Sequence, residues 1–173
     1  MNVLGAVLAG GRSSRFGSDK AAALYRGQPL LEHARAALAK QCAAVIVVGG
    51  DSGLPDWPRP DCGPLGGIGG ALQYAADNGF DAVLTCGVDS LALPDDLLAR
   101  LSPVPAYVAG QPVIGLWPVA SAPALEGLLL SDRTHSMRAF AGLIGARAVD
   151  LEAAPANINT PADLAALEQT HGL

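Results

Sequence analysis

Apolar runs of strand length alternate along the chain with segments whose apolar residues recur at helical spacing. The runs lack the polar alternation of a half-exposed strand, so we expect a sheet that is covered on both faces. Because strands alternate with helices, the connections are expected to be right-handed crossovers in a largely parallel sheet. The pattern predicts strands at residues 3–9, 44–48, 82–86, 106–109, 113–117 and 148–151, and helices at residues 29–40, 65–78, 94–101, 122–130, 136–145 and 161–169.

Turn and cap signals refine this α/β pattern. The triplet Gly110-Gln111-Pro112 separates two neighbouring strand runs and predicts a hairpin, so the sheet is expected to be mixed but mostly parallel. Thr160 is a candidate helix N-cap, and Asp163 would complete a variant capping box. Three predicted helices begin with a proline, namely Pro29, Pro94 and Pro161.

Length and charge limit the function classes. The 173 residues are enough for a single domain, residues 1–173, with one substantial core. The formal net charge of −5 provides no overall positive field that would attract nucleic acid or anionic lipid. No run approaches the roughly 20 apolar residues that a membrane span needs. We therefore expect a soluble protein that binds neither nucleic acid nor membrane.

The cysteines and the N-terminus indicate a cytoplasmic location. Cys42, Cys62 and Cys86 are odd in number and lack C-x-x-C spacing, which argues against a disulfide framework or a zinc site. They are most simply small buried apolar residues. No cationic segment precedes the first apolar run, so we interpret that run as a buried strand rather than a signal peptide.

The first predicted strand leads into the stretch LAGGRSSRFGSDK, residues 8–20, which combines glycines with cations. Glycines at the carboxyl end of a strand let backbone N–H groups approach an anion, and Arg12, Arg15 and Lys20 can add charge. The stretch therefore predicts a phosphate-binding loop, with a structural glycine turn as the alternative. Its spacing fits neither the Walker A loop nor the dinucleotide fingerprint.

Residues 8–21 resemble the signature L-A-G-G-x-S-x-R-[MF]-G-x-D-K-A of the molybdenum cofactor guanylyltransferases, the MobA family. Four further motifs occur in the family's order and extend the resemblance over nearly the whole chain. Residues 63–68 (GPLGGI) resemble G-P-L-A-G-[IM], residues 84–94 (LTCGVDSLALP) resemble C-D-[TM]-P-x-[LI]-P, residues 111–116 (QPVIGL) resemble H-P-x-x-A-L, and residues 157–164 (NINTPADL) resemble N-[IV]-N-T-P-E-[ED]-L.

The resemblance implies a Rossmann-like, three-layer α/β/α nucleotidyltransferase fold and a specific reaction. The terminal phosphate of Mo-molybdopterin would attack the α-phosphorus of GTP, release pyrophosphate and form the guanine dinucleotide cofactor. A phosphate nucleophile is already anionic at neutral pH, so catalysis needs positioning and charge neutralisation rather than a base. The histidines His33, His135 and His171 accordingly need no catalytic role.

The family's nucleotide site maps onto three regions of this chain. Asp89 would be the ligand of Mg²⁺, while Arg15 and Lys20 would neutralise charge on the leaving phosphates, and these three are the predicted catalytic residues. On spacing alone, Asp89 can also be an ordinary turn or cap residue. The predicted nucleotide-binding residues are Leu8, Ala9, Gly10, Gly11, Lys20, Asp56, Gly66 and Asp89.

Two of these assignments have competitors. Asp61 competes with Asp56 for the nucleotide contact, because loop length varies in this region. Gly66 and Gly67 would approach the base or the ribose, or would simply form a tight turn into the helix.

The acceptor site is expected near the C-terminus. Asn157 and Asn159 alternate on an extended segment, so both amides can point toward a pterin, with local Asx turns as the alternative. Arg133 and Arg138 are weaker candidates for the pterin phosphate. The implied partners are GTP, Mo-molybdopterin, and proteins that supply molybdopterin or accept the finished cofactor.

Several positions depart from the family pattern and leave rivals open. Gln111 replaces a histidine, and Gly49 stands where the family has an asparagine. Near Asp89, Gly87 and Ser90 stand where the family pattern has cysteine or proline and threonine. Guanine selection is therefore open to change. The rival hypotheses are a cytidylyltransferase or another nucleotidyltransferase with a different phosphorylated acceptor, and a nucleotide-binding protein without catalysis.

Overall fold

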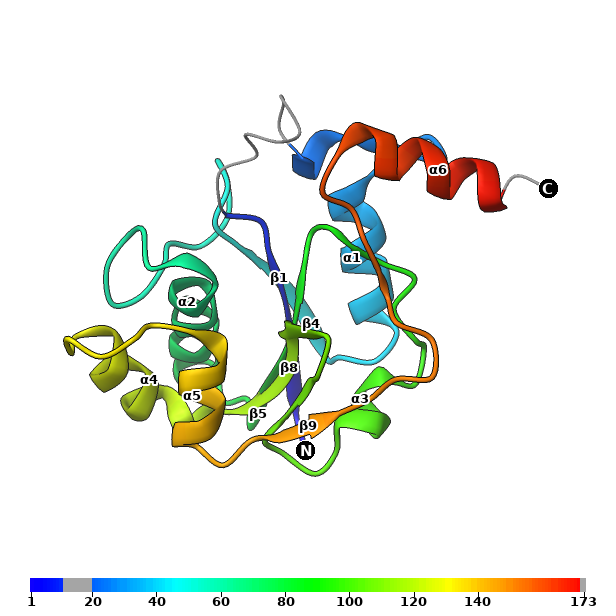
Figure 1. Cartoon of the computed structure of the whole chain (residues 1–173). Helices are drawn as coiled ribbons and strands as arrows, with labels where there is room; N and C mark the ends of the chain where they lie inside the picture. Colours follow the sequence, from blue (N-terminus) through cyan, green and yellow to red (C-terminus); the bar gives the residue numbers. More distant parts are fainter. Residues whose placement is uncertain (11–19, 172–173) are drawn as a thin grey trace.

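A computed structural model describes residues 1–10 and 20–171 (Figure 1). Strand β8 runs antiparallel to both of its neighbours in the central sheet, whereas the other strand pairs are parallel. The predicted mixed sheet and its hairpin are therefore confirmed. In the described residues the sheet has the order β4-β1-β5-β8-β7-β9, formed by β4 (Ala44–Val48), β1 (Val3–Leu8), β5 (Ala82–Gly87), β8 (Gln111–Pro118), β7 (Ala106–Val108) and β9 (Arg147–Val149).

The two central parallel strands, β1 and β5, are buried along their whole length. Their apolar residues have no polar alternation because helices cover both faces of the sheet. Leu8 at the end of β1 pairs with Val48 at the end of β4 and with Gly87 at the end of β5. The three strands therefore finish at one edge of the sheet.

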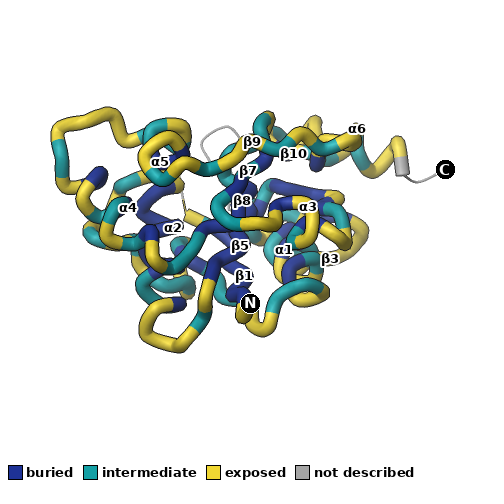
Figure 2. The backbone as a smooth tube through the Cα atoms, turned by 90° about the horizontal axis from the view of Figure 1, so that it is seen from below, coloured by how far each residue is buried: buried dark blue, intermediate teal, exposed yellow. Residues whose placement is uncertain are grey.

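Helices form a layer on each face of the sheet, as the α/β/α prediction requires (Figure 1). On one face, α1 (Leu30–Ala39) and α3 (Leu97–Leu101) contribute to an apolar core that α6 (Pro161–His171) partly covers. On the other face, α2 (Gly63–Asp77), α4 (Ala122–Leu129) and α5 (Met137–Leu143) enclose a second core around Trp117. Figure 2 shows the buried residues along the sheet and the inward sides of these helices.

Two small antiparallel ladders were not anticipated from the sequence. Strand β2 (Leu24–Tyr25) pairs with β3 (Gln28–Pro29), and β6 (Ser90–Leu91) pairs with β10 (Ala156–Asn157). The second ladder ties the C-terminal segment to the chain that follows β5. Single 3-10 turns, η1 (Lys20–Ala22) and η2 (Val119–Ser121), complete the described elements.

Helix boundaries follow the predicted ones with two differences at prolines. Pro161 begins α6 as predicted, but Pro29 ends β3 and serves as the N-cap of α1. Pro94 lies three residues ahead of α3, because the chain makes a turn before it enters the helix. No described helix is long and apolar enough to cross a membrane.

The cysteines are free, as expected, but they are not all buried. Cys86 on β5 is buried, whereas Cys42 and Cys62 are half-buried. Burial raises the pKa of the Cys42 thiol to about 11. Burial also raises the pKa of the Cys86 thiol, with smaller contributions from Asp89 and Cys42. Both thiols are therefore protonated at neutral pH.

Candidate active site

A cavity of about 680 Å³ opens at the sheet edge where β4, β1 and β5 end. This is the edge at which open α/β sheets bind ligands. The ends of β1, β4 and β5, the start of α2 and the turn η1 all contribute to its walls. Its described lining residues are Leu8, Ala9, Gly10, Lys20, Ala21, Val48, Asp56, Asp61, Gly63, Pro64, Gly67, Gly87, Val88, Asp89 and Val113.

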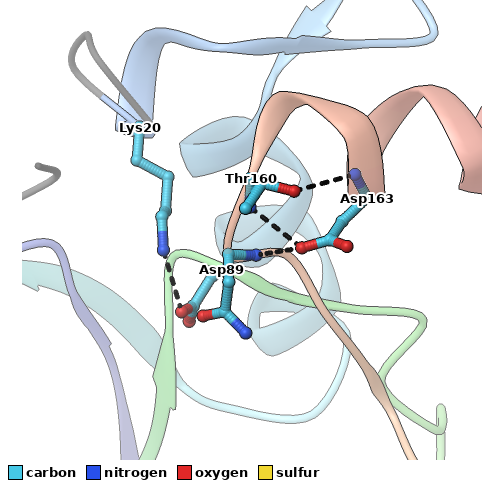
Figure 3. Close-up of polar contacts among 5 residues, drawn as sticks. Lys20, Asp89, Thr160 and Asp163 are labelled. Carbon is cyan, nitrogen blue, oxygen red and sulfur yellow. Dashed lines mark hydrogen bonds and ion pairs between the residues drawn. The ribbon is translucent and has the colours of Figure 1, made fainter. Parts of the chain in front are cut away.

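Lys20 and Asp89 form an ion pair in this cavity, although they are far apart in the sequence. Lys20 Nζ donates to Asp89 Oδ2 over 3.3 Å, and the two side chains are 17% and 27% exposed (Figure 3). Lys20 comes from η1, and Asp89 lies two residues past the end of β5. Two of the three predicted catalytic residues thus lie within reach of one small ligand.

The main chain at the end of β1 is held in place by its neighbouring strands. Ala9 donates its N–H to the Val48 carbonyl over 2.9 Å, and the Val88 N–H reaches the Leu8 carbonyl over 3.2 Å. These bonds align the Leu8, Ala9 and Gly10 backbone along the cavity wall. Gly11 and Arg15, which the sequence also assigned to this site, lie outside the described residues.

The backbone at Gly49 leaves no room for the asparagine that the family has at this position. Its φ is +79°, and a Cβ there would lie 2.6 Å from the Gly10 nitrogen. The backbones of the two glycines therefore pack directly against each other, and no side chain fits between them. Any side-chain amide that contacts a ligand in this cavity must therefore come from another position.

The loop between β4 and α2 delivers Asp56 to the cavity. Trp57 donates its N–H to the Gly66 carbonyl over 3.0 Å, which fixes the loop to the first turn of α2. A Cβ at Gly69 would overlap the Trp57 carbonyl oxygen, and one at Gly70 would overlap that of Pro55. The loop backbone thus lies directly on a glycine face of the helix, with Asp56 between these contacts.

Asp56 and Asp61 both line the cavity, so both sequence candidates reach it. Asp56 is half-buried and Asp61 is exposed. Burial raises the pKa of Asp56 above its ordinary value, a backbone hydrogen bond from Cys62 opposes this, and the nearby Asp61 charge adds to the rise. Gly66 is not among the described lining residues, whereas the adjacent Gly67 is.

The C-terminal segment is bound to the chain at Asp89. Strands β10 and β6 pair Asn157 with Ser90, and Ile158 donates its N–H to the Asp89 carbonyl over 3.0 Å. Ile158 is buried, while Asn157 and Asn159 are exposed on either side of it. This alternation leaves both amide side chains available on the outer side of the segment.

The start of α6 carries the predicted capping box. Asp163 donates its N–H to Thr160 Oγ1 over 3.1 Å, and Asp163 Oδ2 accepts from the N–H groups of Thr160 and Asn159 (Figure 3). These bonds lower the pKa of Asp163, first through Asn159 and then through Thr160, with a smaller contribution from Lys20. The cap therefore fixes Asn159 near the Lys20–Asp89 pair.

Gln111 also holds this segment. Its side-chain amide donates to the carbonyl of Pro155, just ahead of β10. Gln111, which stands where the family signature has a histidine, thus links β8 to the C-terminal segment. It does not line the described part of the cavity.

The remaining candidates lie elsewhere. Arg133 and Arg138 are exposed on the connection from α4 to α5 and on α5, and neither lines the described part of the cavity. His33 Nε2 bonds the Tyr25 carbonyl at 2.6 Å, and His135 Nε2 bonds the Ser131 carbonyl at 2.8 Å. Both histidines thus contact the local backbone rather than the cavity. The His171 side chain lies outside the described residues.

Comparison with known proteins identifies the family. The model of the MobA-like NTP transferase domain matches residues 5–148. The chain belongs to the MobA-like NTP transferase family. It is 38% identical over 180 residues to the molybdenum cofactor guanylyltransferase of Acidiphilium cryptum, covering 94% of this chain and 92% of the relative.

Solved structures show the same fold at low sequence identity. The molybdopterin-guanine dinucleotide biosynthesis protein A of Archaeoglobus fulgidus superimposes with a TM-score of 0.72 at 17% identity, covering 98% of each chain. A CMP:2-keto-3-deoxy-manno-octonic acid synthetase complexed with CTP gives 0.76 at 13% identity, covering 99% of each chain. The fold of this family member is therefore that of the nucleotidyltransferases, and the fold alone does not select the base.

Sequence reasoning missed the apolar part of the cavity. Val48, Val88 and Val113 line it from three different strands or strand ends. Val48 and Val113 belong to the apolar runs that predicted strands, and the runs carry no signal for which residue meets a ligand. Gly67, by contrast, was already a candidate from its motif.

Proposed function

We propose that this chain is a molybdenum cofactor guanylyltransferase, which transfers GMP from GTP to the terminal phosphate of Mo-molybdopterin and releases pyrophosphate. The observation that carries the proposal is the meeting of Lys20 and Asp89 in one cavity at the end of β1. This arrangement supports a triphosphate site with a cation and a carboxylate on the same ligand. The full-length similarity to named guanylyltransferases supports the choice of reaction.

Asp56 is the proposed reader of the guanine base. A carboxylate accepts hydrogen bonds, and guanine presents donors at N1 and at its 2-amino group, whereas cytosine presents its donor only at N4. Asp56 is favoured over Asp61 because it is half-buried and its loop is bonded to α2. A buried polar group discriminates strongly against a base that leaves it without a partner.

The residues around Asp89 fit a magnesium ion that arrives with the nucleotide. Among the described residues there is no cluster of three or more acidic, histidine or cysteine ligands. Mg²⁺ in nucleotide enzymes commonly takes one or two carboxylates and completes its shell with phosphates and water. Asp89 supplies one such oxygen, and the bound ion would neutralise phosphate charge.

The chain's own residues would position the two reactants. The Ala9 and Gly10 backbone, with Gly11, would hold the nucleotide, while Arg15 and Lys20 would hold the β- and γ-phosphates as the bond from the α-phosphorus to the bridging oxygen breaks. No general base is required, because the attacking phosphate is already an anion. The rate therefore depends on alignment and charge stabilisation.

The acceptor would bind on the side of Asp89 that carries the C-terminal segment. Asn157 and Asn159 are the proposed pterin contacts. Arg133 and Arg138 do not line the described part of the cavity, and we propose them only as contacts to the pterin phosphate of the bound acceptor. We place the reaction in the cytoplasm, where proteins that supply molybdopterin and accept the cofactor would meet this chain. We also propose that residues 1–173 form a single domain.

The test is transfer of labelled α-phosphate to Mo-molybdopterin in the presence of Mg²⁺. The expected result is incorporation from GTP with pyrophosphate release, little incorporation from CTP, and loss of both products in Asp89→Ala. Preference for CTP would instead support the cytidylyltransferase hypothesis. Nucleotide binding without pyrophosphate release would support the non-catalytic one, and either result rejects the proposal.

A further inference from the structure

Each of the two carboxylates assigned to base and metal rests against a residue that has no side chain. A Cβ at Gly66 would lie 2.8 Å from Asp56 Oδ2 and 2.8 Å from the Cys62 Cβ. A Cβ at Gly87 would overlap Asp89 Oδ1, and Ser90 Oγ would be 3.6 Å from it. Both carboxylates thus occupy space that any other residue would fill.

The backbone does not require glycine at either position. Neither Gly66 nor Gly87 is among the described glycines with a positive φ. Gly66 is buried in the first turn of α2, where alanine favours the helix more. Gly87 is the last residue of β5, and glycine is disfavoured in strands. Space for the Asp89 carboxylate is therefore the physical reason for Gly87, and space for the Asp56 carboxylate and the Cys62 Cβ together is the reason for Gly66.

Nothing else in the described residues holds the free oxygen of Asp89. Its Oδ2 accepts from Lys20, but no described donor bonds Oδ1. The nearby Ser90 hydroxyl is buried and also has no hydrogen-bond partner among the described residues. The direction of Oδ1 is thus set by packing over Gly87.

We propose that Gly66 and Gly87 are positioning residues, which direct the Asp56 carboxylate toward the base and the Asp89 carboxylate toward the metal–phosphate group. The inference rests on the proposed function. A methyl group at position 87 meets the end of a short side chain, so the Asp89 carboxylate turns away while the fold persists. A methyl group at position 66 also meets the Cys62 Cβ, so it displaces the N-cap residue of α2 together with the Asp56 carboxylate.

The test uses Gly66→Ala and Gly87→Ala with two matched controls. Gly127 on α4 and Gly142 on α5 have open space at the Cβ position, so Gly127→Ala and Gly142→Ala add a methyl without a clash. The first readout is the ratio of kcat/KM for GTP to that for ITP, which lacks the 2-amino group. The second is Mn²⁺ affinity in the presence of α,β-methylene GTP, measured by electron paramagnetic resonance without turnover.

The two variants should change different readouts. Gly66→Ala should lower the GTP-to-ITP ratio by about tenfold, as for loss of a hydrogen bond to a charged group, and leave Mn²⁺ affinity unchanged. Gly87→Ala should weaken Mn²⁺ binding by about 10-fold to 100-fold, as for loss of an outer-shell contact, and leave the ratio unchanged. In an Asp56→Asn background, Gly66→Ala should have no further effect on the ratio.

A ratio of two substrates does not depend on how much of the enzyme is folded, so lost stability alone cannot produce the first result. The inference is overturned if wild type prefers GTP yet both variants retain the wild-type values, if both variants lower both readouts alike, or if a variant does not fold. A wild-type chain without preference for GTP over ITP would reject base reading by Asp56 through the 2-amino group and leave the role of Gly87 standing. The proposed function itself is rejected only by the test with labelled GTP and CTP.

Discussion

At the scale of single residues, the Lys20–Asp89 pair is the centre of the proposed chemistry. The two side chains are mostly shielded from water and lie 3.3 Å apart, so each supplies the counter-charge that the other needs there. A triphosphate with a divalent ion offers both groups a replacement partner of the right sign. The cavity is therefore matched to a ligand that is anionic and metal-bound at once.

Replacing Lys20 by methionine tests this view of the cation. Lys20→Met should lower kcat/KM for GTP by about 100-fold, because it removes a donor at the developing phosphate charge. The control is Lys40→Met, which breaks an exposed pair with Asp95 on the surface and should leave the kinetics unchanged. Steady-state pyrophosphate release measures both. Equal effects of the two substitutions would contradict a specific role for Lys20.

Asp56 gives a prediction about pH and stability. Its pKa is raised in the folded protein, so between the unfolded and folded pKa values the folded state binds more protons, and stability falls as pH rises through this window. Asp56→Asn should therefore be more stable than wild type at neutral pH, and the difference should vanish below the unfolded pKa. Urea denaturation at neutral and acid pH measures it. A wild type more stable than the variant at neutral pH would reject the stated burial effect.

At the scale of elements, the glycine face of α2 determines where the Asp56 loop lies. Alanine in place of these glycines would favour the helix but would exclude the loop backbone. The loop can approach the helix only where no Cβ intervenes, as it does at Gly69 and Gly70. The helix thus acts as a support for the loop that is proposed to read the base.

Gly70→Ala should reveal this packing. The new methyl would overlap the Pro55 carbonyl oxygen, which belongs to the backbone and cannot turn away, so a loss of about 1–3 kcal/mol in unfolding free energy is expected. Gly127→Ala on α4 should instead gain up to about 1 kcal/mol, because its methyl meets open space. Chemical denaturation compares them. Stabilisation by Gly70→Ala would show that the loop is not supported by the helix.

The sequence predicted the elements of the central layers well and the small ladders poorly. Runs such as residues 44–48 are apolar enough to predict a strand, and the observed β4 has the same bounds, although at the edge of the sheet only Val48 of this strand is fully buried. The β6–β10 ladder has only two residues in each strand, and its pairing joins segments that are far apart in the chain. Local periodicity carries no signal for such contacts. The same limit hid the contact of Gln111 with Pro155.

At the scale of the whole molecule, the nucleotide side and the proposed acceptor side meet at Asp89. The β1 edge and α2 form one side, and the segment from β10 to the start of α6 forms the other. The Ile158–Asp89 backbone bond joins the two directly. Variants on one side should therefore affect one substrate more than the other.

Asn157→Ala and Asn159→Ala test this division. Each should raise KM for Mo-molybdopterin by about tenfold while leaving KM for GTP close to wild type, because the exposed amides face away from the core. Asn78→Ala is the control, since that side chain only bonds the Tyr74 carbonyl at the far end of α2. Steady-state kinetics with each substrate varied in turn gives the values. A rise in KM for GTP alone would place these amides on the wrong substrate.

The most direct measurement is a crystal structure of the chain with α,β-methylene GTP and Mg²⁺. The account predicts one nucleotide at the end of β1, with an Asp89 oxygen about 2.1 Å from the ion, Lys20 on the β- or γ-phosphate, and the base at Asp56. A nucleotide whose phosphates lie beyond the reach of Lys20 and Asp89 would contradict it.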